Sequence, residues 1–398
     1  MVKVMKTKLK NICIKIGSGA TPRGGKEAYH GGNFALIRSQ NVLDFVFSSD
    51  GLVYINDEQA NKLDNVALEK GDVLLNITGD SVARACIVPE KILPARVNQH
   101  VAIIRGNNKE VLQEYILFFL QMSKDRLLQL ASAGATRNAL TKGMIEDLEI
   151  DLPTIEIQKK IVQVLDNICK KIDLNKEIND NLLQQALCVY GELITNKDKN
   201  GTIGKYCSVK SGFAFKSSWW IDSGIKVIKI GSINQDNLNL NDCSYVSIDK
   251  VEKASDFTVG AGDLLIAMTG ATIGKFAMVP YSTDILLVNQ RVGKFFLGES
   301  PVQKLPFIYC TLKQPDISNE IINRGQGSAQ PNISASDIMS IPCVIPSKDI
   351  IFDFNATMQP LFDLIITNQH ENQKLSEIRD NILPQLMLGE LNSSNINI

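Results

Sequence analysis

GDVLLNITG at residues 71–79 returns as GDLLIAMTG at residues 262–270, a shift of 262 − 71 = 191 positions. VNQ at residues 97–99 returns at residues 288–290 after the same 191 positions. Further along, two asparagines at 175 and 179 return at 368 and 372, after 193 positions. So regular a spacing indicates a duplicated unit, in which a globular part is followed by a helical part.

The composition is that of a globular protein. The chain has 398 residues, of which 44% are apolar and 21% are charged, and this length predicts two domains with a core each. We find no apolar run of 18 residues and no signal-peptide pattern, so we expect a cytoplasmic protein with no membrane partner. The net charge of −1 weakens the electrostatic case for nucleic-acid binding, which usually goes with a basic domain.

Short apolar runs bounded by turns predict buried strands in both copies. They lie at residues 36–38, 73–77, 86–88 and 101–104, and again at residues 227–229, 264–268, 277–279 and 292–296. A helix is predicted from about residue 114 to residue 132. We therefore expect a mixed α/β fold, with globular parts at residues 1–152 and 197–345 and helical parts at residues 153–196 and 346–398.

After Pro153 the apolar period becomes seven, which predicts the seam of a coiled coil. A helix over residues 154–193 would span about 60 Å at 1.5 Å per residue. The second helical part repeats the seam, although Arg379 interrupts it. Pro384 is expected to kink this second helix near its end, because proline cannot donate the backbone hydrogen bond of a helix interior.

Asn175, Asn179, Asn368 and Asn372 occupy seam positions, where polar residues lower stability but fix register and partner. Our hypothesis is that the two helices pack antiparallel, with Asn175 near Asn372 and Asn179 near Asn368. The alternative is that each asparagine is only a tolerated polar residue on a solvated stretch.

The sequence lacks the usual groups of an enzyme active site. Its three histidines are far apart and lack the spacing of metal ligands. GATIGK at residues 270–275 resembles a phosphate loop but is one residue short, and Phe276 stands where a serine or threonine is needed. We interpret this stretch, and residues 79–84 of the first copy, as strand-turn-strand corners that present Lys275 and Arg84. The pattern predicts a chain without catalytic activity or a bound metal.

The eight cysteines are scattered along the chain and form no Cys-x-x-Cys pair. In a reducing cytosol this usage predicts buried thiols, neither disulfides nor zinc ligands.

Several motifs, each weak alone, become specific through their order and their doubling. They are IGSGATP at residues 16–22, LIRS at 36–39, both Gly-Asp strands with their Thr-Gly, both VNQ segments, the helix openings at 152–153 and 345–346, and NILPQLMLGEL at 381–391. In these motifs the chain resembles the specificity subunits of type I restriction-modification systems. In that family two target recognition domains alternate with two long helical spacers.

The resemblance implies a non-catalytic subunit whose recognition domains each read one half of a split, asymmetric sequence in double-stranded DNA. The spacers would set the gap between the halves and dock two adenine methyltransferase subunits, which bind S-adenosylmethionine. Two translocase-nuclease subunits, with ATP and Mg²⁺, would join for cleavage. No cofactor is expected on this chain itself. The globular parts would be the recognition domains.

Base reading needs Arg, Lys, Asn, Gln or Ser side chains on loops. Domains that read different sequences should share their scaffold and differ in their readers. The repeated Asn-Gln pairs are therefore expected to be loop braces or phosphate contacts, whereas positions that differ, such as Ser39 against Ile230, are better readers. The candidates are Arg38, Ser39, Asn41, Arg84, Asn98, Gln99 and Arg137 in the first copy, and Lys229, Ser232, Asn234, Lys275, Asn289, Gln290, Arg291 and Gln330 in the second.

Two other classes of function stay open from the residues alone. A free-standing DNA-processing enzyme would cleave DNA or turn over ATP without partners. A scaffold that binds protein or glycan would not show the steep salt dependence that counterion release gives to DNA binding.

Overall fold

The computed structural model of the chain describes residues 5–22, 24, 29, 31–133, 138–326 and 331–391. The chain divides into two compact units. Unit 1 comprises Met1–Lys170 and Leu375–Ile398, and unit 2 comprises Lys171–Lys374. We call residues 5–152 the first repeat and residues 201–343 the second repeat.

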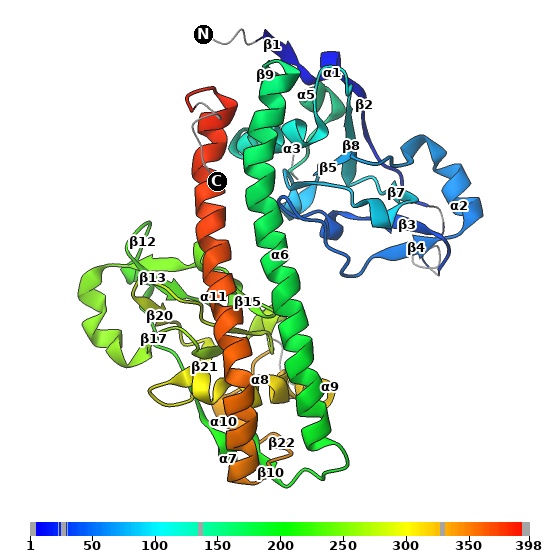
Figure 1. Ribbon diagram of the computed structural model, residues 1–398. Coiled ribbons are helices and arrows are strands. Elements are labelled where there is room, and N and C mark those ends of the chain that lie inside the picture. The colour runs from blue at the N-terminus through cyan, green and yellow to red at the C-terminus, as the bar shows by residue number, and fades with distance from the viewer. Residues whose placement is uncertain are drawn as a thin grey trace. The chain divides into compact units, whose positions relative to one another are not determined.

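Unit 1 contains the first repeat and is a mixed α/β structure (Figure 1). Its strands are β1 (Met5–Lys8), β2 (Cys13–Ser18), β3 (Phe34–Ile37), β4 (Val53–Ile55), β5 (Val73–Asn76), β6 (Ala85–Ile87), β7 (Ala95–Val97), β8 (Val101–Gly106) and β9 (Glu149–Leu152). Its helices are α1 (Leu9–Ile12), α2 (Asp57–Lys62), α3 (Gln113–Met122), α4 (Lys124–Ser132), α5 (Lys142–Glu146) and the start of α6 (Ile155–Ile194).

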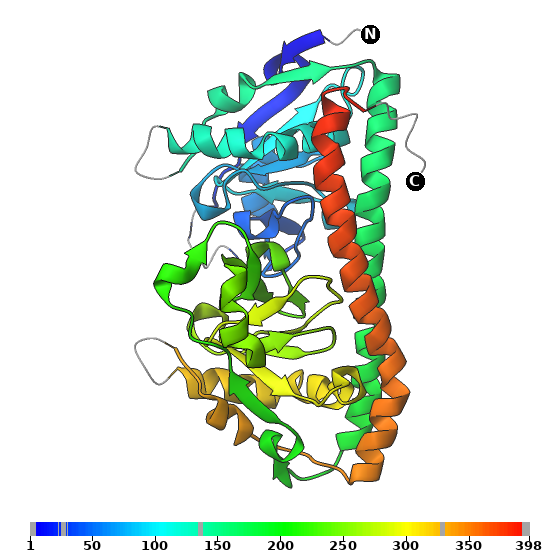
Figure 2. The same cartoon turned by 90° about the vertical axis from the view of Figure 1, so that its left-hand side faces the viewer.

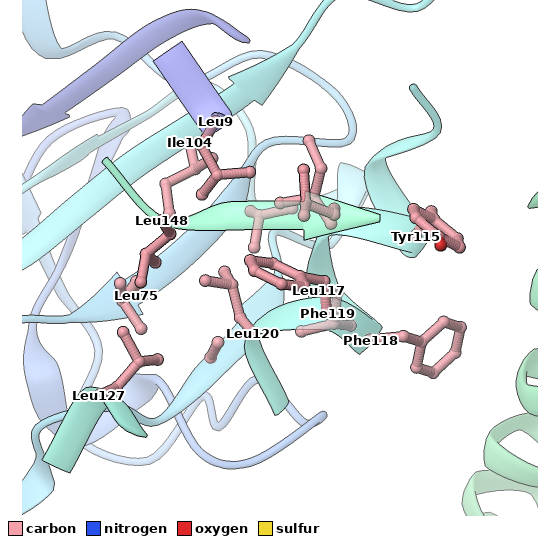
Figure 3. Packing of buried hydrophobic residues seen from close by; sticks show 14 of the residues in the cluster. Leu9, Leu75, Ile104, Tyr115, Leu117, Phe118, Phe119, Leu120, Leu127 and Leu148 are labelled. Atoms are coloured by element: carbon pink, nitrogen blue, oxygen red, sulfur yellow. The ribbon is translucent and has the colours of Figure 1, made fainter. Parts of the chain in front are cut away.

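Two sheets build the first repeat. One has the antiparallel order β2-β8-β5-β6, and the other has the order β4-β3-β7, in which β3 and β7 are parallel. Strand β5 is apolar on both faces because Val73 and Leu75 join the core beneath the helices, whereas Leu74 joins the core of the second sheet. Figure 3 shows the first of these cores, with side chains from α1, β5, β8, α3 and α4 in one cluster.

Unit 2 contains the second repeat. Its strands are β10 (Gly201–Thr202), β11 (Ser208–Ser211), β12 (Trp220–Ile221), β13 (Ile225–Ile228), β14 (Ile233–Asn234), β15 (Asn237–Leu238), β16 (Ser244–Val246), β17 (Thr258–Val259), β18 (Leu264–Ala267), β19 (Phe276–Met278), β20 (Leu286–Val288), β21 (Val292–Phe296) and β22 (Pro342–Cys343). Its helices are the part of α6 from Lys171 onward, α7 (Ile203–Tyr206), α8 (Leu305–Leu312), α9 (Pro315–Gly325), α10 (Ala335–Met339) and most of α11 (Lys348–Met387).

The second repeat has the same topology as the first. The order β11-β21-β18-β19 matches β2-β8-β5-β6, and β13 pairs in parallel with β20 as β3 does with β7. The register of this parallel pair is conserved between the copies, because Val227 faces Leu287 and Leu36 faces Arg96, each shifted by 191. The second sheet is wider here, with the order β12-β16-β13-β20-β17. The internal duplication and the mixed α/β fold are thus confirmed.

The repeated Gly-Asp motif is a structural brace in both repeats. Gly71 and Gly262 have positive φ angles of 86° and 82°, which glycine adopts without strain. The Asp72 carboxylate accepts the Glu69 N–H at 2.8 Å and holds Arg105 on β8 through contacts of 2.6 and 2.7 Å. In the second repeat, Asp263 likewise accepts the Gly260 N–H at 3.0 Å and holds Lys294 on β21 at 2.8 Å.

The helices α6 and α11 each have 40 residues and begin 348 − 155 = 193 positions apart. In unit 2, Asn175 donates to Asn372 at 2.9 Å and Asn368 donates to Asn179 at 2.8 Å. Residues later in α6 thus pair with residues earlier in α11, so the two helices run antiparallel. Figures 1 and 2 show the two helices side by side within this unit. The antiparallel arrangement that we predicted is confirmed.

In unit 1 the same two helices join the core of the first repeat. Leu165 of α6 and Leu386 of α11 are both buried in that core. The Arg379 guanidinium, which interrupts the seam, lies 3.8 Å from the centroid of the Phe45 ring, so this residue packs against the first repeat. Helix α11 continues through Pro384 to Met387 as one helical segment.

Two further expectations need correction. The helix predicted over residues 114–132 is two helices, because α3 ends at Met122 and α4 begins at Lys124. The cysteines are not uniformly buried: Cys188 is exposed, and Cys13 and Cys169 are half-buried.

Candidate nucleic-acid interface

Three segments meet at the carboxyl ends of the parallel strands in each repeat. In the first repeat they are residues 38–41 after β3, residues 98–100 after β7, and the corner at residues 79–84 between β5 and β6. Backbone bonds hold them together, since the Asn98 N–H donates to Ile37 O and the Ile77 N–H donates to His100 O. We call these segments the strand-end turns.

The second repeat builds the same strand-end turns at residues 229–232, 289–291 and 270–275. The equivalent backbone bonds recur, from the Asn289 N–H to Ile228 O and from the Met268 N–H to Arg291 O. Most of the predicted DNA-contacting residues lie on these turns. The structure therefore brings together, within each repeat, side chains that are up to about 60 positions apart in sequence.

Asn41 and Ser232 do not fit the reading role that we predicted for them. Both are completely buried. The Asn41 carboxamide accepts the Arg38 N–H and donates to the carbonyls of Ser48 and Asp50. The Ser232 hydroxyl donates to Asp242 O at 3.1 Å. These two equivalent side chains close the first strand-end turn of each repeat and are not available to a ligand.

The residue at the start of this turn is a cation in both repeats, and each cation is held by the protein. Arg38 donates through Nη2 to Gly51 O at 2.6 Å, and its guanidinium lies 6.0 Å from the Tyr29 ring centroid. The Lys229 Nζ lies 3.6 Å from the centroid of the Trp220 ring, a cation–π contact. Partial burial, and then the nearby Arg291 charge, lower the pKa of Lys229 below its ordinary value.

Ser39 and Ile230 occupy the next position of the turn, and both are half-buried. The Ser39 carbonyl accepts from the buried Asn76 side chain at 2.9 Å. Ile230 instead lies beside Gly270, because its Cδ1 is 3.7 Å from the point where a Cβ would stand on that glycine. The two copies thus place a hydroxyl and an apolar side chain at equivalent points of one scaffold.

The Asn-Gln pairs divide into a brace and an exposed side chain. Asn98 and Asn289 are buried, and their Oδ1 atoms accept the N–H of the residue two positions later, at 3.0 and 3.3 Å. Gln99 and Gln290 are exposed. The asparagines therefore act as loop braces, one of the two roles expected for the pair, whereas the glutamines can reach a ligand.

The residue after each glutamine differs between the two repeats in identity, in burial and in its contacts. His100 is half-buried, with its Nδ1 at 2.6 Å from the Thr78 hydroxyl and its Nε2 at 3.1 Å from Gln99 Nε2. Arg291 is exposed, and its guanidinium makes no hydrogen bond or ion pair with any described residue. The equivalent threonine, Thr269, keeps a buried hydroxyl oxygen without a partner. We did not single out His100 from the sequence, because only the alignment of the strand-end turns reveals its position.

A shallow pocket of about 240 Å³ opens at the strand-end turns of the second repeat. Its polar wall contains Lys229, Gln290 and Arg291, and its apolar wall contains Phe215 and Trp220. None of the residues that line this pocket is acidic. The pocket therefore combines positive charge with aromatic surface, which suits an electron-rich ligand.

The corners behave as strand-turn-strand connections, as the sequence predicts. Arg84 and Lys275 are half-buried, and neither makes a side-chain hydrogen bond or ion pair with the described residues. Each corner also borders the polar loop that follows α4 or α9, because the Gly79 N–H donates to Asn138 O and the Gly270 N–H donates to Pro331 O. Two predicted readers on these loops, Arg137 and Gln330, lie outside the described residues.

Asn234 lies just beyond the first strand-end turn of the second repeat, exposed on the short strand β14 opposite Asn237. The sequence reasoning missed an aromatic cluster beside the pocket. Trp219 stacks on Phe213, and the amines of Lys216, Lys250 and Lys253 lie 5.4–5.8 Å from its ring. The adjacent tryptophans, the only two in the chain, were the available signal.

A second polar cluster lies on the helices inside unit 2. The buried Asn175 donates to Glu371 at 2.7 Å as well as to Asn372, and Lys171 pairs with Glu371 at 3.2 Å. The Asn175 hydrogen bond, and then the Lys171 contact, lower the pKa of Glu371, while desolvation opposes them. Asn175 keeps its own Oδ1 buried without a partner. The four seam asparagines thus form a polar layer in the seam.

Neither a metal centre nor a membrane span is evident in the described part of the chain. No group of three or more His, Cys, Asp or Glu side chains there could hold a metal ion. No described helix is long and apolar enough to cross a bilayer.

Comparisons with known proteins give one consistent result. A family model described as Type I restriction modification DNA specificity domain matches residues 1–184 and again residues 197–379. The chain is 21% identical over 370 residues to the type I restriction enzyme MjaVIII specificity subunit of Methanocaldococcus jannaschii, which covers 86% of each chain. It is 23% identical to the MjaIX specificity subunit of the same organism, over 96% of this chain and 92% of that protein.

A solved structure supports the fold. The crystal structure of a type I restriction-modification S subunit from M. genitalium matches with a TM-score of 0.50 and 15% identity, covering 97% of this chain and 96% of that one. At this identity the likeness concerns the fold alone.

Proposed function

This chain belongs to the family of type I restriction modification DNA specificity domains, and we propose that it selects the DNA sequence on which a type I restriction-modification complex acts. Each repeat reads one half of a split, asymmetric site in double-stranded DNA. The chain itself carries out no chemistry and holds no cofactor.

One observation carries the proposal. The strand-end turns keep the same backbone bonds in both repeats, yet they carry different side chains at equivalent positions, such as the half-buried His100 and the exposed Arg291. A scaffold that is kept while the side chains on it change is what two readers of different sequences require. Base edges in the major groove differ in their pattern of donors and acceptors, so different side chains select different bases.

The helices supply the second part of the proposal. Two helices of 40 residues, packed antiparallel and registered by the seam asparagines, fix the gap between the two half-sites. Their outer faces dock two adenine methyltransferase subunits, which carry S-adenosylmethionine. Two translocase-nuclease subunits, with ATP and Mg²⁺, complete the complex for cleavage.

Partner subunits also account for the weak charge of this chain. A net charge of −1 leaves little long-range attraction for DNA, so the partners provide much of the grip on the phosphates. The cations of this chain act locally, at the strand-end turns.

Mapping of methylated adenines in the genome, with and without this gene, tests the proposal. We expect one bipartite motif, with a constant gap, to lose its methylation when the gene is deleted. Unchanged methylation would refute the proposal. Purified chain should bind duplex DNA with steep salt dependence and should neither cleave DNA nor hydrolyse ATP, which separates this function from a free-standing enzyme and from a protein- or glycan-binding scaffold.

A further inference from the structure

The pocket at the strand-end turns of the second repeat holds an arginine that the fold does not use. Arg291 is exposed on the turn after β20, and its guanidinium has no partner among the described residues. The turn itself is rigidly built, because Asn289 Oδ1 accepts the Arg291 N–H and the Gln290 N–H donates to Phe213 O. A side chain that is free on a braced turn can meet a ligand with little loss of order in the backbone.

Comparison with the first repeat shows that the Arg291 side chain does not support the backbone of its turn. The equivalent residue, His100, is bound to Thr78 and so contributes to the turn. Thr269 stands in the place of Thr78, but its hydroxyl is buried and unpaired. The second repeat therefore closes this turn without a bond from the side chain at position 291 to its threonine. A role toward a ligand gives a reason for the presence of Arg291.

The surroundings of Arg291 define the chemistry of that ligand. Lys229, held 3.6 Å from the Trp220 ring centroid, is a second cation in the same pocket, and none of the lining residues is acidic. Two cations in a pocket without an acidic lining residue suit a ligand that offers hydrogen-bond acceptors. The guanidinium fork pairs best with two neighbouring acceptors, and guanine presents O6 and N7 in this way in the major groove.

Comparison of the two repeats suggests different roles for Lys229 and Arg291. A cation is kept at positions 38 and 229 in both repeats, as a contact with the uniform phosphate backbone would require. Position 291 differs from position 100, as a contact with bases would require. We propose, building on the proposed function, that Arg291 reads a guanine in the half-site of the second repeat while Lys229 contacts the backbone.

Methylation mapping in cells that contain the partner methyltransferase tests this assignment. The wild-type motif should contain a guanine in one half-site. Arg291→Ala should reduce discrimination at that one position by about 10- to 100-fold and leave the other half-site and the gap unchanged. Arg291→Lys keeps the charge but loses the fork, so it should relax the same position. Lys205→Ala, which removes an exposed cation from α7, is the matched control and should change nothing.

Each outcome separates the inference from the function on which it rests. If the wild type yields no bipartite motif, the proposed function fails and the inference fails with it. A bipartite motif without guanine in either half-site, or one that Arg291→Ala leaves intact, overturns only the inference. Equal loss at all sites in Arg291→Ala that Arg291→Lys restores would make Arg291 a phosphate contact and would also overturn it. Thermal unfolding of each variant checks that the second repeat remains folded.

Discussion

The two Gly-Asp carboxylates allow the duplication to be tested as a matched pair. Asp72 is fully buried and binds Arg105 through two oxygens, at 2.6 and 2.7 Å. Asp263 retains 7% exposure and binds Lys294 at 2.8 Å. We predict that Asp72→Asn is more destabilising than Asp263→Asn, although the two residues hold the same place in the repeat.

The magnitudes follow from what each substitution leaves behind. Asp72→Asn removes two charged contacts from a guanidinium that is only 13% exposed and that keeps its contacts with Glu69 and Ala67 O. Breaking a buried pair costs about 3–5 kcal/mol, and the remaining contacts place the loss at the lower end of this range. After Asp263→Asn, Lys294 keeps its hydrogen bond to Thr258 O at 3.2 Å. The loss there should be that of one charged hydrogen bond, about 1.5–3 kcal/mol. Glu69→Gln is the control, because that carboxylate is 66% exposed and its contact with Arg105 should be worth less than about 1 kcal/mol.

Urea unfolding can follow the two repeats separately. Both tryptophans belong to the second repeat, so their fluorescence reports Asp263→Asn, whereas amide exchange on β5 reports Asp72→Asn. The reasoning is refuted if Asp72→Asn costs less than about 1 kcal/mol, or if Asp263→Asn costs more than Asp72→Asn does.

Three further predictions concern the helices, the turns and the corners. Because the pKa of Glu371 is lowered, its contact with Asn175 stabilises the fold above the ordinary glutamate pKa, and this stabilisation is lost as the pH falls through the lowered value. In Asn175→Ala the stability measured by circular dichroism should therefore depend less on pH in this acidic range. An unchanged pH dependence would contradict this. Gly212→Ala should lower the free energy of unfolding by about 1–3 kcal/mol in thermal unfolding, because the added Cβ would stand 2.4 Å from Val288 O. Gly17→Ala is the control and should have a much smaller effect, because a Cβ there would meet nothing within 4 Å. Lys275→Ala should weaken DNA binding equally for all sequences and reduce the salt slope by about 1, and a change in the methylated motif would instead make Lys275 a reader.

The long helices and the main strands were predictable because their patterns are periodic. The seam predicted a helix over residues 154–193, and α6 spans Ile155–Ile194. The break between α3 and α4 was not predictable, because the apolar spacing continues across Ser123 although the backbone does not. Strands such as β12 and β17 contain two residues each, too few to show any period.

The candidate site was predictable in residue type and position but not in side-chain direction. Asn41 and Gln99 are both amides beside a strand end, yet Asn41 is buried and donates to the carbonyls of Ser48 and Asp50, whereas Gln99 is exposed. The difference depends on whether nearby carbonyls are within reach, which is a property of the folded backbone. The contact of Lys229 with Trp220 was invisible for the same reason, since nine positions separate the two residues in sequence.

The duplication itself separates residues that serve the fold from residues that serve the ligand. Asp72 and Asp263, and also Asn98 and Asn289, are kept in identity and in contact, and each accepts a backbone N–H of its own turn. Thr269 is kept in identity but has no partner equivalent to the His100 that contacts Thr78, since position 291 is arginine. Position 291 is thus a place where the scaffold is repeated and the side chain is not, and its exposed guanidinium has no partner among the described residues. These two properties together rank Arg291 above the other exposed polar residues of these turns as a contact with bases.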